Sequence, residues 1–212
     1  MRGDREIENI HECRSFEKGD KTRLAVILAG GMSRRMGGDD KAEAMLAGER
    51  LVDRVARRLQ AQAGRLLISG AKDYGTGLQT VPDLTDGPRG PVAGIFAIAQ
   101  WLRCHAPEAE EFFTLPVDAP FAPADLVERL AAAGGTAIAS DGDRDHPTFA
   151  RWRLDSLAIA WPKFADQPSP SLKALAEACG AFRVVWSEPR CFLNLNTKQD
   201  LIEAARFLES LE

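Results

Sequence analysis

The sequence predicts an α/β fold of three layers, with helices on both faces of a mostly parallel, mixed sheet. Three observations predict it. Short apolar runs alternate with segments of helical periodicity along the 212 residues, which is typical of a parallel sheet covered by crossover helices. Several of these runs end in polar or glycine-rich loops, as strands do at the edge of such a sheet. A hairpin-like stretch late in the chain adds antiparallel pairing.

In the first half of the chain, strands and helices are expected in alternation. Apolar residues recur at helical spacing over residues 48–63, and Gly64 can end that helix. Pro91 suits the first turn of a second helix, which carries apolar residues as far as Leu102. The strands expected around these helices share short apolar runs and are 24–28, 65–69, 80–82 and 112–117.

In the second half, glycines and polar runs delimit the elements. Gly134-Gly135 closes a helix that begins at Pro123, and a polar loop, 141–147, separates two strands. Ser169 is a candidate cap for one helix, and Thr197 to Asp200 resembles a capping box with Asp in place of the usual Glu. The elements expected here are strands 136–140, 148–152 and 182–186 and helices 123–133, 154–164, 171–179 and 198–208.

Composition and charge narrow the class of protein. The chain is 45% hydrophobic and 27% charged, with a formal net charge of −4. These values are ordinary for a soluble globular protein and argue against a nucleic-acid-binding face. No apolar run is long enough to span a bilayer, so no membrane association is expected.

The chain is expected to form one domain behind a short extension. Residues 1–21 are charged throughout and lack the apolar core of a secretory signal, which predicts a disordered extension. Residues 22–212 are expected to form a single domain. The four cysteines are scattered, without the spacing of a zinc site or a redox dithiol, which favours a cytoplasmic location.

One stretch organises the rest of the chain: the apolar strand 24–28, which breaks into a glycine- and arginine-rich loop ending at Lys41. Glycines let the backbone approach a ligand closely, N–H groups bind anions, and Arg and Lys add positive charge. We therefore expect this loop to hold a nucleoside triphosphate. It lacks the three spaced glycines of a dinucleotide fingerprint, and Ala42 follows Lys41 where a P-loop has Ser or Thr. The alternative is a surface loop whose cations are merely solvated.

Two carboxylates stand where expected strands end. Asp118 follows an apolar strand and lies between Pro116 and Pro120, which restrict the backbone on both sides. A carboxylate there can bind Mg²⁺, which takes oxygen ligands from one or two carboxylates and from substrate phosphates. Asp83 follows the strand 80–82 in the same way. For both residues the alternative is a turn or helix-capping role.

His146 and the tryptophans leave further alternatives open. His146 stands in the charged run 143–146 and is either a general base or a polar loop residue. The four tryptophans fall on expected helices or strands, and we expect them to pack in the core instead of binding a ring.

Several segments match, in order, the signature of a known family. They are Leu28-Ala29-Gly30-Gly31-x-Ser33-x-Arg35-Met36-Gly37 with Asp40-Lys41, Pro82-Asp83, Gly90-Pro91-Val92-Ala93-Gly94, Pro116-Val117-Asp118-Ala119-Pro120, Gly142-Asp143-Arg144-Asp145-His146-Pro147-Thr148 and Asn194-Leu195-Asn196-Thr197. Over residues 23–208 the chain resembles nucleotidyltransferases with a Rossmann-like, GT-A-type fold. It is most similar to the molybdenum cofactor guanylyltransferases (MobA-type enzymes).

The resemblance implies transfer of GMP from GTP to the terminal phosphate of molybdopterin or its molybdenum-bound form, with release of pyrophosphate and Mg²⁺ as cofactor. It implies backbone contacts of residues 28–30 (Leu28, Ala29 and Gly30) to guanine and ribose, and a nucleoside contact of Asp83. The implied catalytic set is Arg35 and Lys41, which bind the triphosphate, and Asp118, which binds the metal and GTP. The implied pterin side consists of Arg144, His146, Asn194 and Asn196. Ser69 departs from the family, which often has Asn there.

The implied partners are GTP and the pterin, with cofactor-maturation proteins and acceptor molybdoenzymes as further candidates. Two rival functions stay open. One is a related nucleotidyltransferase that uses CTP or a sugar phosphate, because loop physics does not select the base. The other is a non-catalytic nucleotide-binding accessory protein, which would keep the glycines without needing Asp118 and Lys41.

Overall fold

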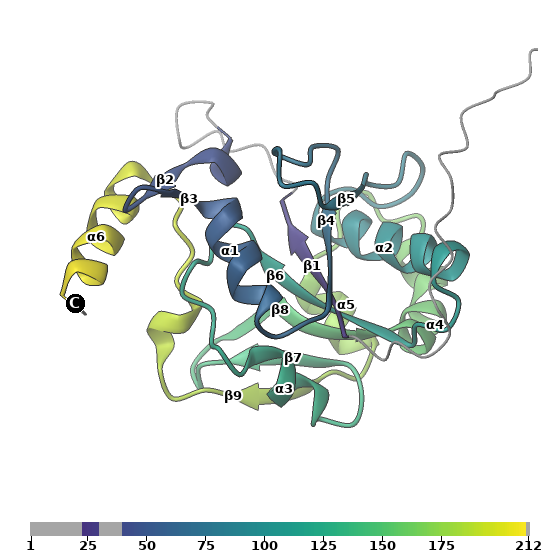
Figure 1. The fold of residues 1–212 in the computed structure, drawn as a ribbon. Helices are drawn as coiled ribbons and strands as arrows, with labels where there is room; N and C mark the ends of the chain where they lie inside the picture. The colour runs from purple at the N-terminus through teal and green to yellow at the C-terminus, as the bar shows by residue number, and fades with distance from the viewer. Residues whose placement is uncertain (1–22, 30–39, 211–212) are drawn as a thin grey trace, which may run out of the picture.

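The predicted three-layer α/β fold is confirmed by a computed structural model, which describes residues 23–29 and 40–210 (Figure 1). The expected extension, residues 1–21, lies outside the described residues. The strands are β1 (Leu24–Leu28), β2 (Met45–Leu46), β3 (Glu49–Arg50), β4 (Arg65–Ser69), β5 (Gln79–Val81), β6 (Glu111–Pro116), β7 (Ala137–Ser140), β8 (Asp145–Arg153) and β9 (Phe182–Val185). The helices are α1 (Leu51–Gln60), α2 (Pro91–His105), α3 (Leu126–Ala131), α4 (Leu154–Phe164), α5 (Leu172–Ala178) and α6 (Lys198–Glu209), with 3₁₀ turns η2 (Lys41–Glu43) and η3 (Pro189–Phe192).

Within the described residues, seven strands form one mixed sheet in the order β5-β4-β1-β6-β8-β7-β9. Strands β5, β4, β1 and β6 are parallel to one another. Strand β8 is antiparallel to both β6 and β7, which confirms the antiparallel component expected late in the chain. The parallel strands therefore end at one edge of the sheet, at Leu28, Ser69, Val81 and Pro116.

Both faces of the sheet are buried, and β1 shows how its sequence achieves this. Leu24 and Val26 pack into a core with α2, α4 and α5, whereas Ala25 and Ile27 pack into a second core with α1 and α3. Successive strand residues point to opposite faces, so a continuous apolar run is needed where helices cover both sides. Trp152 and Trp186 are buried in these cores, as expected.

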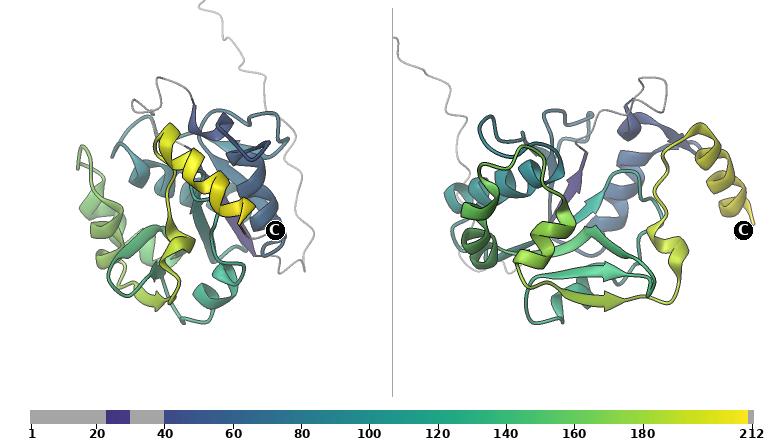
Figure 2. Two further views of the ribbon diagram at one scale, coloured as in Figure 1. Left: turned by 90° about the vertical axis from the view of Figure 1, so that its left-hand side faces the viewer. Right: turned by 180° about the vertical axis from the view of Figure 1, so that it is seen from behind.

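A third, smaller core lies beyond the end of the sheet. The β2–β3 hairpin follows the 3₁₀ turn that carries Lys41, and α6 packs against it through Leu46, Leu195 and Ala204. Figures 1 and 2 show α6 beside β2 and β3, away from α2 and α4. The hairpin was not predicted, because each strand has only two residues. Its turn places Ala47 and Gly48 at positive φ, without the Asn-Gly pair that signals such turns.

Several boundaries differ from those predicted: the helix expected at 123–133 is α3 at Leu126–Ala131, and the helix expected at 48–63 is α1 at Leu51–Gln60. Two further differences have an identifiable cause. The segment 145–147 was expected in a loop but begins β8, where the register shifts opposite Ile138/Ala139. Pro147 is tolerated there because it falls in the irregular part of the pairing with β7. The cap of α5 is Ser171, not Ser169: the Ser171 hydroxyl accepts a hydrogen bond from the backbone N–H of Ala174 at 3.1 Å.

Candidate active site at the carboxyl edge of the sheet

Loops that follow the parallel strands meet at one edge of the sheet. The backbone N–H of Ala29, after β1, donates to the Ser69 carbonyl at the end of β4 at 3.2 Å. The N–H of Val117, after β6, donates to the Leu28 carbonyl at 3.1 Å. These bonds hold Ala29, the last described residue before the glycine-rich loop, between the ends of β4 and β6. Ligands of open α/β sheets bind at such strand ends.

The central feature of this edge is a cluster around the Lys41 ammonium group. Lys41 Nζ donates to Asp118 Oδ2 at 2.7 Å and also to Asn196 Oδ1. The Lys41 and Asp118 side chains are only 22% and 13% exposed. Residues far apart in the chain thus bring a cation, a carboxylate and an amide together, as a charged ligand requires.

Each member of this cluster is held by local structure. The backbone N–H of Leu195 donates to the Asp118 carbonyl at 2.8 Å, which ties the segment before α6 to the end of β6. The expected capping box at Thr197 and Asp200 is confirmed. At the other end, the Asp40 side chain caps the turn of Lys41 by accepting from the Ala42 N–H at 3.2 Å.

The loop 70–78 contacts the same turn. Lys72 Nζ lies 3.2 Å from Asp40 Oδ2. Partial burial, together with the Asp40 carboxylate to which Tyr74 is hydrogen-bonded, raises the pKa of the Tyr74 phenol to about 12. The hydrogen bond of Tyr74 helps to fix Asp40, and so the start of the turn that presents Lys41, whereas the exposed ion pair of Lys72 adds little.

A second group of polar atoms lies at the ends of β4 and β5. A Cβ atom added to Gly94, in the first turns of α2, would lie 2.5 Å from Ser69 Oγ and 3.2 Å from Asp83 Oδ1. Glycine at this position therefore lets the buried Ser69 hydroxyl and the Asp83 carboxylate approach the helix and each other. Partial desolvation raises the pKa of Asp83 above its ordinary value, although its side chain is still exposed. A hydroxyl and a carboxylate are suited to reading the polar edge of a base.

Some predicted nucleotide-binding residues can be placed only in part. The Ala29 N–H bonds to Ser69, so a backbone contact from Ala29 to a nucleoside would have to use its carbonyl. Gly30 and Arg35 lie outside the described residues. No direct interaction joins Asp83 to Lys41 within the described part of the chain, so the two polar groups form separate portions of the edge.

His146 is tied into the scaffold at the start of β8. His146 Nε2 lies 2.9 Å from Asp141 Oδ2, and its ring stacks on Phe192 with centroids 4.6 Å apart. Backbone hydrogen bonds from Arg144, and the bond to His146, lower the pKa of the Asp141 carboxyl. Through Phe192, this strand start contacts the segment that continues to Asn194.

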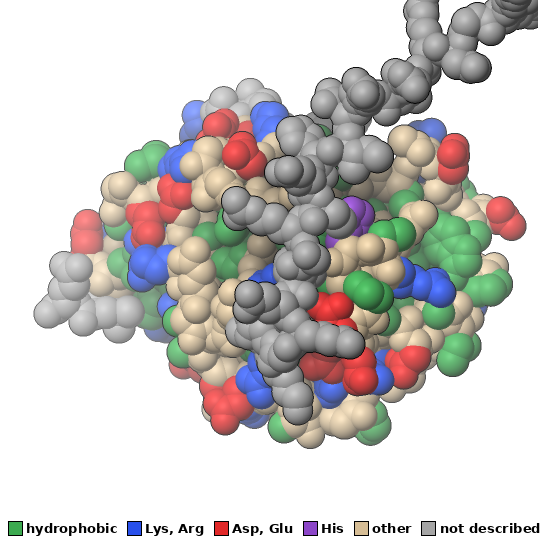
Figure 3. Space-filling view, turned by 45° about the vertical axis from the view of Figure 1, so that its right-hand side comes forward, with side chains coloured by type: hydrophobic (Ala, Val, Ile, Leu, Met, Phe, Trp, Pro, Cys, Tyr) green, Lys and Arg blue, Asp and Glu red, His purple; other side chains and the backbone are tan. Residues whose placement is uncertain are grey.

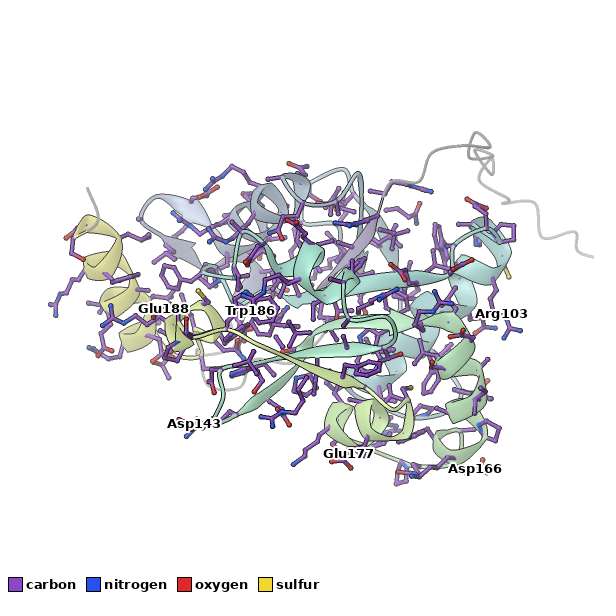
Figure 4. The ribbon with its side chains drawn as sticks, turned by 90° about the horizontal axis from the view of Figure 1, so that it is seen from below. Arg103, Asp143, Asp166, Glu177, Trp186 and Glu188 are labelled. Carbon is purple, nitrogen blue, oxygen red and sulfur yellow. The ribbon has the colours of Figure 1, made fainter. Side chains whose placement is uncertain are left out.

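The remaining predicted acceptor-side residues are exposed. The Arg144 side chain lies on the turn between β7 and β8, next to Asp143, which Figure 4 labels at the outer end of that turn. Asn194 is exposed beside a groove of about 420 Å³ between α6 and the segment 193–195. Asn196, predicted on the same side, contacts Lys41. The amide of Asn196 donates to the Asn194 carbonyl at 3.2 Å, which links the two asparagines.

Metal binding would rest on Asp118. The described residues contain no group of three or more His, Cys, Asp or Glu side chains that could hold an ion by themselves. Mg²⁺ commonly uses one or two carboxylates and completes its shell with water and substrate phosphates. A single carboxylate at the strand end, beside a cation suited to phosphate, fits a metal that arrives with a nucleoside triphosphate.

Two residues of the site were not singled out from the sequence. The capping box had predicted where α6 begins, but not that Asp200 also binds the Asn196 backbone at 2.7 Å. The steric role of Gly94 was also missed, because it depends on the spatial approach of Ser69 and Asp83. Only the repeated glycines of the 90–94 segment hinted at close backbone packing.

Among the described residues, no helix combines the length and apolar character needed to cross a bilayer. On the face drawn in Figure 3, Lys and Arg side chains are interspersed with Asp and Glu. Cys104, Cys179 and Cys191 are free in the part of the chain that the structure describes.

Known proteins resemble this chain in sequence. Residues 25–185 match the MobA-like NTP transferase domain. A molybdenum cofactor guanylyltransferase of Cereibacter sphaeroides is 39% identical over 194 residues, which cover 87% of this chain and 96% of that protein. One of Rhodopseudomonas palustris is 37% identical over 197 residues, which cover 86% of this chain and 92% of that protein.

Solved structures resemble it in fold. Molybdopterin-guanine dinucleotide biosynthesis protein A from Archaeoglobus fulgidus superposes with a TM-score of 0.67 at 22% identity, covering 88% of this chain and 99% of that one. 2-C-methyl-D-erythritol 4-phosphate cytidylyltransferase from Thermus thermophilus gives a TM-score of 0.58 at 17% identity, covering 88% and 98%. The predicted nucleotidyltransferase type of fold is therefore confirmed.

Proposed function

This chain belongs to the MobA-like NTP transferase family, and from that premise we propose that it transfers GMP from GTP to the terminal phosphate of molybdopterin, with release of pyrophosphate. The resemblance seen in the sequence is confirmed, and the chain is a nucleotidyltransferase. One observation carries the proposal: the partly buried cluster of Lys41, Asp118 and Asn196 at the edge where the parallel strands end. It supplies charge for a triphosphate beside the oxygen ligand of a metal.

The reaction makes and breaks one P–O bond. An oxygen of the acceptor phosphate attacks the α-phosphorus of GTP, and the bond from the α-phosphorus to the bridging oxygen of the β-phosphate breaks. The bond electrons leave with pyrophosphate, and a new phosphoanhydride joins GMP to the pterin. The acceptor phosphate is already ionised at neutral pH, so no general base is required. The catalytic work is charge neutralisation and in-line positioning.

Lys41 and Arg35 are proposed to neutralise the triphosphate. In the structure without ligand, the Lys41 ammonium bonds to Asp118 and Asn196, and a triphosphate would compete for the same protons. Each donor aimed at developing charge contributes on the order of 10²- to 10³-fold in rate. Arg35 is assigned from its place in the glycine-rich loop.

Mg²⁺ is proposed as the cofactor, with Asp118 as its protein ligand. The carboxylate at the end of β6 is suited to an ion that also binds substrate phosphates. When bound, the ion supplies positive charge to the phosphates and stabilises the leaving pyrophosphate. Asp118 has a second task of its own: it orients Lys41 through the bond at 2.7 Å.

The nucleoside is proposed to lie at the ends of β1, β4 and β5. The backbone of residues 28–30 would line its base and ribose, and Asp83 would accept hydrogen bonds from the base. A guanine edge offers adjacent N–H donors, which match a carboxylate. Ser69 adds a hydroxyl that lies, like Asp83, against Gly94 of α2.

The acceptor is proposed to bind on the opposite side of the triphosphate. Arg144, His146 and Asn194 would face it, with Asn196 at the boundary because it contacts Lys41. Arg144 offers an exposed cation to an anionic acceptor, and the groove beside Asn194 has the size for part of a ring system. The stacked pair of His146 and Phe192 gives this side a rigid wall.

We also propose the extent of the domain, its location and its partners. Residues 22–212 would act as one nucleotidyltransferase domain in the cytoplasm. Its product would pass to acceptor molybdoenzymes, and cofactor-maturation proteins would supply its substrate.

Pyrophosphate release with GTP, CTP, ATP and UTP, each with and without molybdopterin, tests the proposal. Release that requires both GTP and the pterin is expected. Release with CTP and not GTP would overturn the choice of base and favour a cytidylyltransferase, an activity named for one protein of this fold. Binding without any release would favour a non-catalytic accessory protein.

A further inference from the structure

The Asp200 carboxylate does more than close the first turn of α6. As in a usual capping box, Asp200 Oδ2 accepts from the backbone N–H of Thr197 at 2.9 Å, and Thr197 Oγ1 accepts from the Asp200 N–H at 3.1 Å. The same Oδ2 atom also accepts from the backbone N–H of Asn196 at 2.7 Å. The cap motif does not require this additional bond, which is the shorter of the two. This bond connects Asp200 to Asn196, the residue before the cap, whose side chain contacts Lys41.

Asn196 connects this cap to the charged cluster. Its side-chain carbonyl accepts from Lys41 Nζ, and its side-chain amide donates to the Asn194 carbonyl at 3.2 Å. With its backbone N–H held by Asp200, Asn196 is fixed at its main chain and at both ends of its amide. Its oxygen therefore stays beside Lys41, whose other partner is Asp118 at 2.7 Å.

Packing makes the connection rigid. Lys41 precedes the β2–β3 hairpin, Asn196 precedes α6, and the third core joins the hairpin to the helix through Leu46 and Ala204. The hydrogen bonds from Asn196 and Thr197 lower the pKa of Asp200, so its acceptor oxygens stay ionised at neutral pH. An ionised acceptor makes the stronger bond to a backbone N–H.

We propose that Asp200 is a positioning residue for nucleotidyl transfer, which holds the Asn196 carbonyl oxygen against Lys41 and thereby aims the Lys41 ammonium at the triphosphate. This rests on the proposed function only in taking Lys41 as a triphosphate ligand. Asp200 is not proposed to contact the triphosphate, although its side chain also lines the groove of about 420 Å³ beside Asn194. Its effect on rate passes through Asn196, which separates it from an ordinary helix cap.

Paired variants distinguish positioning from capping. Asp200→Ala removes both the cap and the bond to Asn196, whereas Thr197→Ala removes a capping side chain and leaves the Asp200–Asn196 bond. We expect Asp200→Ala to lower kcat/KM for pyrophosphate release by about 10- to 100-fold, since small misplacements of catalytic groups have effects of this size. We expect Thr197→Ala to stay within about 3-fold of wild type and Asp200→Glu, the usual capping-box residue, to recover most of the activity.

A double-mutant cycle tests whether Asp200 acts on the rate through Asn196. In an Asn196→Ala background, Asp200→Ala is expected to lower kcat/KM by no more than about 3-fold, because the group that it positions is already gone. An unchanged loss in that background would overturn the proposal, as would an equal loss in Thr197→Ala. Should Asp200→Ala not fold, judged by thermal melting, Asp200→Asn replaces it in the same cycle: its uncharged amide oxygen is a weaker acceptor for both backbone bonds, so the same pattern is expected with a smaller loss.

Amide hydrogen exchange gives a readout that does not depend on turnover. The Asn196 N–H is expected to lose protection in Asp200→Ala and to keep it in Thr197→Ala. Retained protection in Asp200→Ala would overturn the proposal. The wild-type protein is assayed first with all four nucleoside triphosphates, and the cycle is run with whichever nucleotide it uses. If GTP is not the substrate, the wild-type assay shows it. If Asp200 is not a positioning residue, only the variants show it.

Discussion

Replacing Gly94 by alanine would put a methyl group into the contact between α2 and the ends of β4 and β5. The added Cβ would lie 2.5 Å from Ser69 Oγ and 3.2 Å from Asp83 Oδ1. The backbone of Gly94 is helical, so alanine is conformationally acceptable there and even favoured by about 1 kcal/mol. The steric contact alone decides the outcome.

The size of the effect follows from these distances. Ser69 Oγ must move by about 0.9 Å to reach ordinary contact at 3.4 Å, and Ser69 is buried at 3% exposure, with little room to move. Overpacking of this kind costs about 1–3 kcal/mol, which the helix propensity of alanine partly offsets. A shift approaching 1 Å in the Ser69 hydroxyl, beside the Asp83 carboxylate that is proposed to bind the base, is expected to lower kcat/KM for GTP by about 10- to 100-fold.

Steady-state pyrophosphate release, with thermal melting alongside, measures both effects. Gly94→Ala should lower kcat/KM for GTP while lowering the free energy of unfolding by no more than about 2 kcal/mol. The double variant Gly94→Ala/Ser69→Ala removes the clashing oxygen while Ser69 Cβ, at 3.7 Å, still fits. It should return to the activity of Ser69→Ala alone. Wild-type kinetics in Gly94→Ala would refute the assignment of Ser69 and Asp83 to the nucleoside site.

Three further predictions concern charge. Asp118→Asn should lower the turnover rate by about 10²- to 10³-fold. It should change the free energy of unfolding by only about 1 kcal/mol, because the ion pair of Asp118 with Lys41 is partly exposed. Turnover above a tenth of the wild-type rate in this variant would contradict the metal assignment. Lys41→Met should raise the KM for GTP and lower kcat, whereas Lys72→Met, which removes an exposed ammonium near the same turn, should match wild type in the same assay. Burial raises the pKa of Asp83, so kcat/KM for GTP should fall as the pH is lowered through that pKa and the carboxylate is protonated. Protein stability should change in the opposite sense: the stabilisation from protonated Asp83 is present at low pH and is lost as the pH rises through the same pKa. In Asp83→Asn this inflection should disappear from the pH–rate and pH–stability curves.

Elements that depend on local pattern were predictable from the sequence. The strand at 65–69 and the helix at 154–164 match the structure to the residue, because apolar runs and flanking glycine or polar residues define them without help from the rest of the chain. The capping box at Thr197 was likewise readable, since its two hydrogen bonds join residues three apart. Parallel strands ending at one edge then placed Asp83 and Asp118 in a common region.

Contacts between residues far apart in the sequence could not be predicted and were seen only in the structure. Lys41 and Asn196 are 155 residues apart, and no local pattern indicates their bond. The β2–β3 hairpin is stabilised by packing against α6 more than by its own short strands. His146 looked like a loop residue by composition, yet it lies in β8, where it is paired with Ala139 of β7, a partner that local composition does not reveal.

Isotope transfer tests the central claim most directly. Purified protein is incubated with Mg²⁺, molybdopterin and GTP labelled at either the α- or the γ-phosphorus, and the products are separated. The account predicts α-label in a pterin–guanine dinucleotide and γ-label only in pyrophosphate, with dinucleotide and pyrophosphate formed in equal amounts. Label from the γ-position on the pterin, or α-label recovered only as free GMP, would contradict it.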